Sequence, residues 1–169
     1  MSQEPPKIYV DWPEYFALLQ KLFERIRDSG WEPEQVVCIA RGGLIPGDLA
    51  SRFFRVPLAV LSVASYPDHT TAQEEMYFSR DLTTARPLKR NKVLLLDDLT
   101  ESGKTLAETV KWLAYWYGIE PKEIRSGVVW HKGWSGFVPD FYAEVISEGL
   151  GGERPWIIQP QEQFRKGGH

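Results

Sequence analysis

The stretch Val93-Leu94-Leu95-Leu96-Asp97-Asp98-Leu99-Thr100-Glu101-Ser102-Gly103-Lys104-Thr105-Leu106 carries the strongest structural signal in the chain. The aliphatic run within 92–96 predicts a strand buried on both faces. Two adjacent carboxylates follow it, then a short loop with one glycine, and then a helix predicted over 105–117. In parallel α/β sheets such a loop lies at the carboxyl edge of the strands, where ligands bind.

The loop after this strand has the chemistry of a phosphate site. The N–H groups at a helix N-terminus attract anions, and Gly103 lets the backbone approach one closely. Asp97 and Asp98 do not suit a phosphate, and we expect them to face a sugar diol, a metal ion or a developing positive charge. A nucleotide-triphosphate P-loop is excluded because Asp98 stands where that motif needs glycine. The hydroxyl donors of the loop are Thr100, Ser102 and Thr105.

Outside this stretch, predicted helices alternate with short apolar strands. The pattern indicates a single α/β domain over 1–169, with a mainly parallel twisted sheet flanked by helices. The predicted elements are a helix from Asp11 to about Gly30, a strand at 36–40, a helix at 45–54, a strand at 58–63, a strand at 123–130, and strand-like pieces at 142–146 and 156–158. The long polar segment at 65–90 is predicted to be an irregular functional loop, with a small hairpin of its own as the alternative.

Bulk composition limits the classes of function. The 169 residues suffice for one core, and no apolar run approaches the roughly 20 residues of a membrane span. The net charge of -3 argues against a nucleic-acid partner, which requires a basic face. Cys38 is the only cysteine and stands in an apolar run, so we expect a buried, unreactive thiol. With a polar start of the chain, this favours a cytoplasmic location.

The quoted stretch resembles the binding motif for 5-phosphoribosyl diphosphate (PRPP) of type I phosphoribosyltransferases. The resemblance implies that Thr100, Glu101, Ser102, Gly103, Lys104 and Thr105 bind the 5′-phosphate. It also implies that Asp97 and Asp98 contact the ribose hydroxyls, with Asp98 near a Mg²⁺ ion. Carboxylates there would stabilise the oxocarbenium character of ribosyl transfer.

Two further segments match the same family. Arg41-Gly42 resembles its pyrophosphate loop, in which the arginine would grip the leaving group. Ser65-Tyr66 resembles the start of a mobile loop that closes over the diphosphate and excludes water. For Tyr66 alone, packing at a strand end is an almost equal alternative.

Two positions indicate which base is accepted. Lys132 corresponds to the lysine that donates to the exocyclic oxygen of a purine in purine-specific members. The segment at 155–160 resembles the hood of xanthine-guanine phosphoribosyltransferases, so Trp156 would stack on the purine and the Ile157 carbonyl would meet its edge. The hood is predicted over about 131–165. The alternatives are a surface lysine and a tryptophan in a core strand.

The chain departs from the family pattern at two places. Glu101 stands where purine enzymes of this group have aspartate, the candidate general base near N7 of the base. Residues 149–154 also lengthen the hood. The implied function is Mg²⁺-dependent transfer of phosphoribose from PRPP to guanine, xanthine or hypoxanthine by a homodimer or homotetramer. The alternatives are a PRPP-sensing regulator of the same fold, or a transferase for a pyrimidine or another base.

Overall fold

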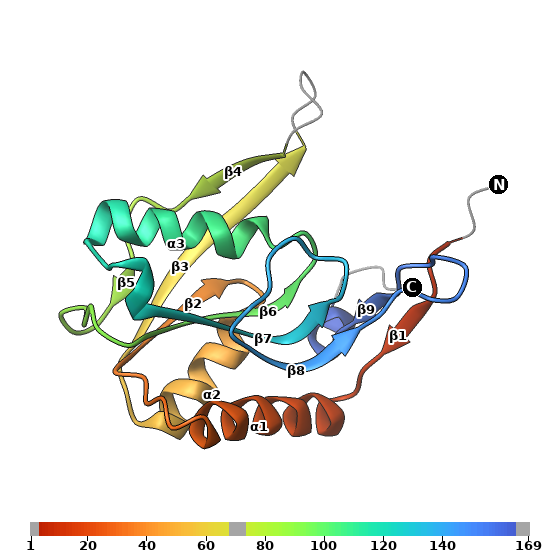
Figure 1. Cartoon of the computed structure of the whole chain (residues 1–169), viewed down its shortest axis with the longest axis horizontal. Coiled ribbons are helices and arrows are strands. Elements are labelled where there is room, and N and C mark those ends of the chain that lie inside the picture. Colours follow the sequence, from red (N-terminus) through yellow and green to blue (C-terminus); the bar gives the residue numbers. More distant parts are fainter. Residues whose placement is uncertain (1–3, 68–73, 165–169) are drawn as a thin grey trace.

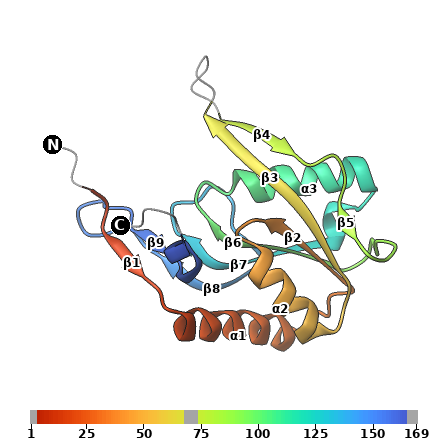
Figure 2. The same cartoon turned by 180° about the vertical axis from the view of Figure 1, so that it is seen from behind.

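The computed structural model describes residues 4–67 and 74–164, which form a twisted α/β sheet with helices on both faces (Figures 1 and 2). The seven-stranded sheet has the order β4-β3-β2-β6-β7-β8, with β5 paired to β3. The pairs from β3 to β8 along this order are parallel, as predicted. In chain order the elements are β1 (Lys7–Tyr9), α1 (Trp12–Asp28), β2 (Gln35–Ala40), α2 (Leu44–Phe54), β3 (Leu58–Pro67), β4 (Glu74–Phe78), β5 (Thr83–Thr84), β6 (Val93–Thr100), α3 (Lys104–Tyr117), β7 (Ile124–Lys132), β8 (Phe141–Ile146) and β9 (Trp156–Ile158), with short 3₁₀ turns at Pro121–Glu123 and Pro160–Phe164.

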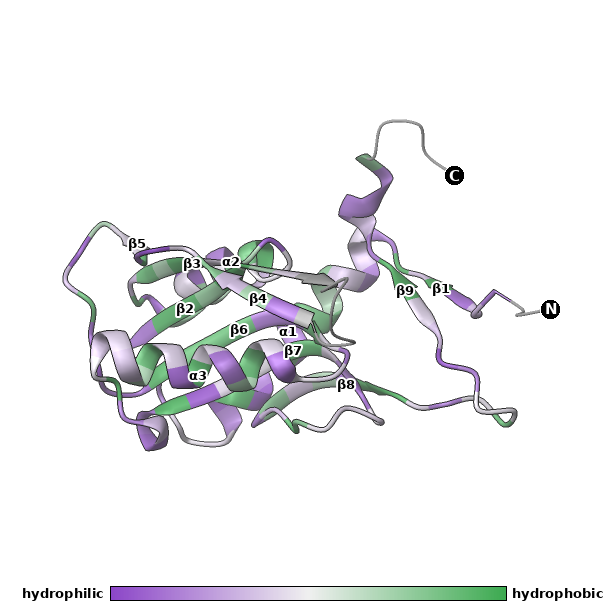
Figure 3. Ribbon diagram, turned by 90° about the horizontal axis from the view of Figure 1, so that it is seen from above, coloured by the Kyte–Doolittle hydropathy of each residue, from purple (hydrophilic) through white to green (hydrophobic). Residues whose placement is uncertain are grey.

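The inner strands are buried on both faces because successive side chains point to opposite sides. On β6, Leu94 and Leu96 belong to the core that is shared with α1 and α2. Val93 and Leu95 belong to the core that is shared with α3. Figure 3 shows these strands coloured largely as hydrophobic. Two cores, one on each face, therefore hold β6 and the loop at its end in place.

The first helix begins as its sequence predicts. The Asp11 side chain accepts a hydrogen bond of 2.8 Å from the backbone N–H of Glu14, which caps the helix. The inward face of α1 packs on β7 and β8, and Leu22 and Ile26 are fully buried there. Residues at helical spacing thus cover one face of the sheet.

The contact between α2 and β2 depends on a glycine. A Cβ atom at Gly47 would lie only 2.4 Å from the Cβ of Cys38, so the helix reaches the strand only because Gly47 has no side chain. Cys38 is completely buried, and burial raises the pKa of its thiol to about 12. The thiol therefore stays protonated at neutral pH, and the prediction of a buried apolar role is confirmed.

The segment at 65–90 holds a hairpin, which was the alternative to a wholly irregular loop. β3 continues through Ser65 to Pro67 and pairs with the antiparallel strand β4. The ring of Phe78 on β4 stacks on Trp112 of α3 with centroids 5.8 Å apart. This aromatic contact fixes the hairpin from outside the segment, which is why local polarity was misleading. Residues 68–73 lie outside the described residues.

The hood differs from the predicted C-terminal segment in two ways. Lys132 and the whole of β8 belong to the main sheet, although the hood was predicted over about 131–165. The N-terminal strand β1, which was not predicted, pairs in parallel with β9 and aligns Ile8 with Ile157. The hood is therefore built from both ends of the chain (Figure 1).

The longest described helix has 17 residues, and none of the helices within 4–67 and 74–164 is both long and apolar enough to cross a membrane.

Candidate active site

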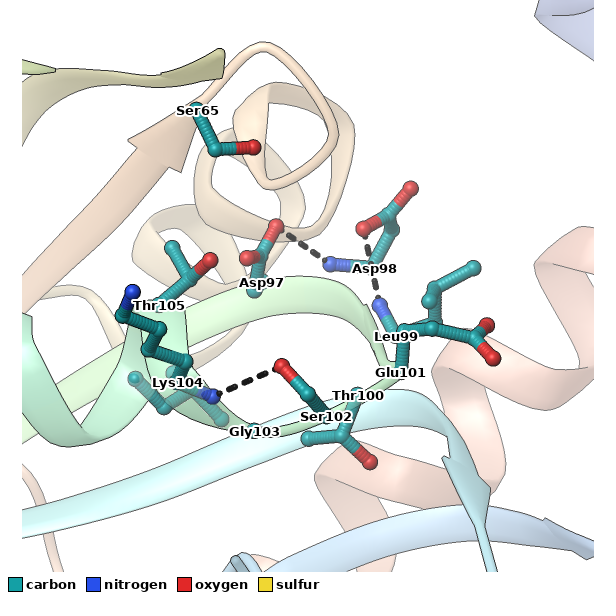
Figure 4. Close-up of a pocket in the computed structure, with 11 residues that line it drawn as sticks. Ser65, Asp97, Asp98, Leu99, Thr100, Glu101, Ser102, Gly103, Lys104 and Thr105 are labelled. Carbon is teal, nitrogen blue, oxygen red and sulfur yellow. Dashed lines mark hydrogen bonds between the residues drawn. The ribbon is translucent and has the colours of Figure 1, made fainter. Parts of the chain in front are cut away.

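A cavity of about 650 Å³ opens at the carboxyl end of β6. Its lining consists of Ser65 from β3 and every residue from 97 to 106 (Figure 4). The sequence singled out nearly all of these positions, and the structure brings them around one space. β6 delivers the acidic pair, and the N-terminus of α3 closes the opposite side.

The two carboxylates are held by backbone N–H groups. Asp97 accepts a hydrogen bond of 2.9 Å from the N–H of Asp98, and Asp98 accepts one of 2.8 Å from the N–H of Leu99. Asp97 is only 9% exposed, and its burial together with the nearby charge of Asp98 raises its pKa well above the usual range. A buried acid next to a half-buried one can meet a cation or hydroxyl groups at this edge of the sheet.

Asp98 is the point where three distant segments meet. A Cβ atom at Gly42 would lie 2.4 Å from the Asp98 carboxyl carbon, so the Arg41-Gly42 loop packs directly against this acid. The buried amide of Gln159, next to the hood strand, donates to the other carboxylate oxygen. Arg41 itself is exposed. Sequence reasoning did not identify Gln159, whose only signal was an amide next to the base-stacking segment.

The loop before α3 depends on Gly103. This residue has φ +79°, and a Cβ atom there would lie 2.2 Å from the Cβ of Phe137. The backbone N–H of Gly136 donates to the Ser102 carbonyl over 3.2 Å, and the Ser102 hydroxyl accepts from the N–H of Lys104. The helix starts at Gly103 without a side-chain cap. The segment after β7 therefore supports the loop from behind.

His131 is a second residue of the site that sequence reasoning missed. Its Nδ1 lies 2.9 Å from the hydroxyl of Thr100, at the end of β6. The ring is buried, and burial lowers its pKa from 6.5. Parallel pairing places His131 opposite Thr100, so the contact follows from the register of β6 and β7.

Replacing His131 with asparagine is expected to remove an acid-dependent loss of stability. Above pH 6.5 the ring is neutral in both states, so its contribution to stability is complete. Below that pH the unfolded chain binds a proton that the folded chain does not, and the free energy of unfolding falls. Thermal unfolding between pH 7.5 and 5 should show a smaller decrease for His131→Asn than for the wild type. Parallel curves for the two proteins would contradict this.

Lys132 ends β7 rather than following it, and its side chain is buried. Its ammonium group lies 2.9 Å from Glu101 Oε2 and donates to the Pro155 carbonyl over 2.8 Å. Trp156 follows Pro155 in the chain and is 49% exposed. The structure thus brings Lys132 into contact with the predicted general base and with the residue that precedes Trp156.

Some predicted positions lie less directly at the cavity. The side chain of Ile157 is buried in the core, so only its backbone is left to contact a ligand. Ser65 lines the cavity from within β3, which continues to Pro67, and the mobile loop implied by the resemblance stays a prediction. Tyr66 also lies on β3, but its side chain is outside the described residues.

The comparisons with known proteins agree with this geometry. The model of the family described as "Phosphoribosyl transferase domain" matches residues 7–163. A curated xanthine-guanine phosphoribosyltransferase from Idiomarina loihiensis is 26% identical over 101 residues. That match covers 59% of this chain, and the chain spans 60% of the length of this relative.

Solved structures extend the similarity to nearly the whole chain. A purine phosphoribosyltransferase from Pyrococcus horikoshii superposes with a TM-score of 0.74 at 27% identity, covering 95% of this chain and 96% of that one. The xanthine-guanine-hypoxanthine phosphoribosyltransferase of Helicobacter pylori shares the fold, with a TM-score of 0.71 at 19% identity and coverage of 91% and 92%.

Proposed function

The chain belongs to the phosphoribosyl transferase domain family, and from this premise we propose that it transfers the 5-phosphoribosyl group of PRPP to an oxopurine, with release of pyrophosphate. The observation that carries the proposal is the 2.9 Å contact between Glu101 and Lys132. It joins the loop at 100–105 to a buried cation, which also donates to the carbonyl of Pro155, the residue before the exposed Trp156. Such a site offers one end to a phosphosugar and the other to a flat ring that bears a carbonyl oxygen.

In this proposal the 5′-phosphate lies in the loop at 100–105. The N-terminal turn of α3 carries partial positive charge, and the hydroxyls of Thr100, Ser102 and Thr105 add donors. Gly103 gives the loop its left-handed turn before α3, a conformation that an L side chain would strain. The ribose then reaches back toward the end of β6, where Asp97 and Asp98 can accept hydrogen bonds from its hydroxyls.

The reaction exchanges one bond at the ribose C1′ atom for another. The bond to the pyrophosphate oxygen breaks with its electron pair, and a ring nitrogen of the purine forms the new bond. Positive charge develops on the sugar as the first bond lengthens, and the carboxylates of Asp97 and Asp98 stabilise it. The purine gives up one proton, for which Glu101 is the assigned acceptor. Arg41 and the backbone at Gly42 are assigned to the departing pyrophosphate.

The base is assigned to the space between Lys132 and the hood. The ammonium group would donate to the exocyclic oxygen at position 6 and stabilise negative charge that spreads onto the ring. Trp156 offers an exposed face on which a purine can stack, a contact worth about 1–3 kcal/mol per base. The Ile157 carbonyl would accept from the edge of the ring.

The acidic pair also fits Mg²⁺. No group of three or more potential metal ligands occurs among the described residues, which argues against a complete protein cage. Mg²⁺ is usually held by one or two carboxylates together with substrate phosphates, and the end of β6 offers two carboxylates. We assign Asp98 to this role. The bound ion would neutralise charge on the diphosphate leaving group.

A panel assay tests the proposal. Purified protein, Mg²⁺ and PRPP are incubated separately with guanine, xanthine, hypoxanthine, adenine, uracil and orotate, and pyrophosphate release is measured. Release with one or more oxopurines supports the proposal and identifies the base. Release only with a pyrimidine would overturn the assignment of the base. No pyrophosphate release with any of the bases, combined with tight PRPP binding in calorimetry, would indicate a PRPP sensor instead.

A further inference from the structure

Trp134, which the sequence had not assigned to the base site, contacts three parts of it. It lies on the turn after β7, and its indole N–H donates to Glu101 Oε1 over 3.1 Å. The ammonium group of Lys132 lies 5.0 Å from its ring centroid. The guanidinium group of Arg154, from the segment that lengthens the hood, lies 5.3 Å from the same centroid. One side chain therefore links the acid, the lysine and the hood.

The Glu101 carboxylate is oriented only because both of its oxygens have partners. Oε1 accepts from Trp134 and Oε2 pairs with Lys132. The Glu101 side chain is 54% exposed, so water would compete for either oxygen if the other partner were lost. The extra methylene of glutamate, compared with aspartate, supplies the reach from the β6–α3 loop to the indole.

The orientation of Lys132 depends on the same arrangement. An ammonium group has three N–H donors, and Glu101 and the Pro155 carbonyl account for two of them. The remaining donor direction is then set by the first two. If the carboxylate swung away from Trp134, the lysine would lose one of the two partners that fix its ammonium group, and the direction of the third donor would no longer be set.

We propose that Trp134 is a positioning residue of the base site, which fixes the Glu101 carboxylate through its indole N–H and thereby aims Lys132 at the exocyclic oxygen of the purine. The inference rests on the proposed transfer to an oxopurine. It assigns Trp134 no contact with the reacting atoms. Its ring, next to Arg154, also ties the position of the longer hood to that of the acid and the lysine.

The experiment removes the N–H but keeps an aromatic ring. Trp134→Phe should raise the KM for the oxopurine and lower kcat/KM about tenfold, equivalent to about 1.4 kcal/mol, the scale of one hydrogen bond to a charged group. The KM for PRPP should change less than twofold. The matched control is Trp116→Phe, because Trp116 is 64% exposed on α3 and absent from the cavity lining; it should behave as the wild type.

Two further variants separate positioning from packing. In a Glu101→Ala background, the Trp134→Phe change should have less than a twofold effect on the KM for the oxopurine, because the acceptor of its N–H is gone. Trp134→His keeps a ring with an N–H donor and should recover most of the kcat/KM that Trp134→Phe loses. This variant also tests the inference if Trp134→Phe fails to fold. Wild-type kinetics in Trp134→Phe, or equal losses in both backgrounds, would overturn the inference. A wild-type protein that is silent with every oxopurine would instead overturn the proposed function.

Discussion

Lys132→Met is expected to lower kcat/KM for the oxopurine by about 100-fold while leaving the affinity for PRPP nearly unchanged. The substitution keeps most of the volume of a buried side chain but removes its charge. The purine oxygen loses a charge-assisted donor, a contact worth roughly 1.5–3 kcal/mol. Glu101 also loses the cation that lies 2.9 Å away, and the Trp134 N–H then holds the acid by its other oxygen alone. Initial rates with varied oxopurine at saturating PRPP would measure the effect.

A matched control distinguishes loss of a specific contact from loss of a positive charge. Lys111 pairs with Glu108 on the exposed face of α3, and its side chain is 72% exposed. Lys111→Met should therefore retain wild-type kinetics. Full oxopurine activity in Lys132→Met would refute the role assigned to Lys132. A loss of PRPP affinity as large as the loss with the base would show that the lysine serves the fold of the whole site instead.

Gly103→Ala is the second substitution with a large expected effect, here on PRPP. Its backbone has φ +79°, where an L side chain costs about 1–2 kcal/mol. The new Cβ atom would also lie 2.2 Å from Phe137 Cβ, so the loop at 100–105 or the segment behind it must move. Because the proposed phosphate contacts depend on that loop, we expect the PRPP dissociation constant to rise about 10- to 100-fold in calorimetry, with a lower melting temperature.

Gly30→Ala separates backbone strain from displacement of the loop. Gly30 has φ +76° at the end of α1, and a Cβ atom there would meet nothing within 4 Å. Gly30→Ala should therefore lower the melting temperature modestly and leave PRPP binding intact. If Gly103→Ala binds PRPP as tightly as Gly30→Ala does, the loop is not the phosphate site and the assignment must be abandoned.

The inner sheet could be predicted because its signals are local. The aliphatic run of β6, the Asp11 cap and the helix that ends at Gly118 each occupy a few consecutive residues. Short apolar runs between helices also indicate parallel strands, since such strands are buried on both faces. The carboxyl edge of the sheet, and with it the position of the cavity, follows from this order of elements.

The parts that were missed depend on contacts between distant residues. The β3–β4 hairpin packs against Trp112 of α3, and because this contact is distant in sequence, the polar residues of the segment itself favoured a loop. The pairing of β1 with β9 joins the two ends of the chain, and each of these strands has only three residues. Strands this short have no periodicity of their own to detect.

The chemistry of the site follows from consecutive residues. A strand that ends in two acids is followed by a hydroxyl-rich loop and a helix, and this order alone brings carboxylates and backbone amides together. The partners of these groups come from elsewhere. Gln159 reaches Asp98 across 61 residues, and Trp134 reaches Glu101 across 33. Such pairs depend on strand register and on how loops pack over the sheet edge, and both are set by burial summed over the whole core rather than by any local pattern.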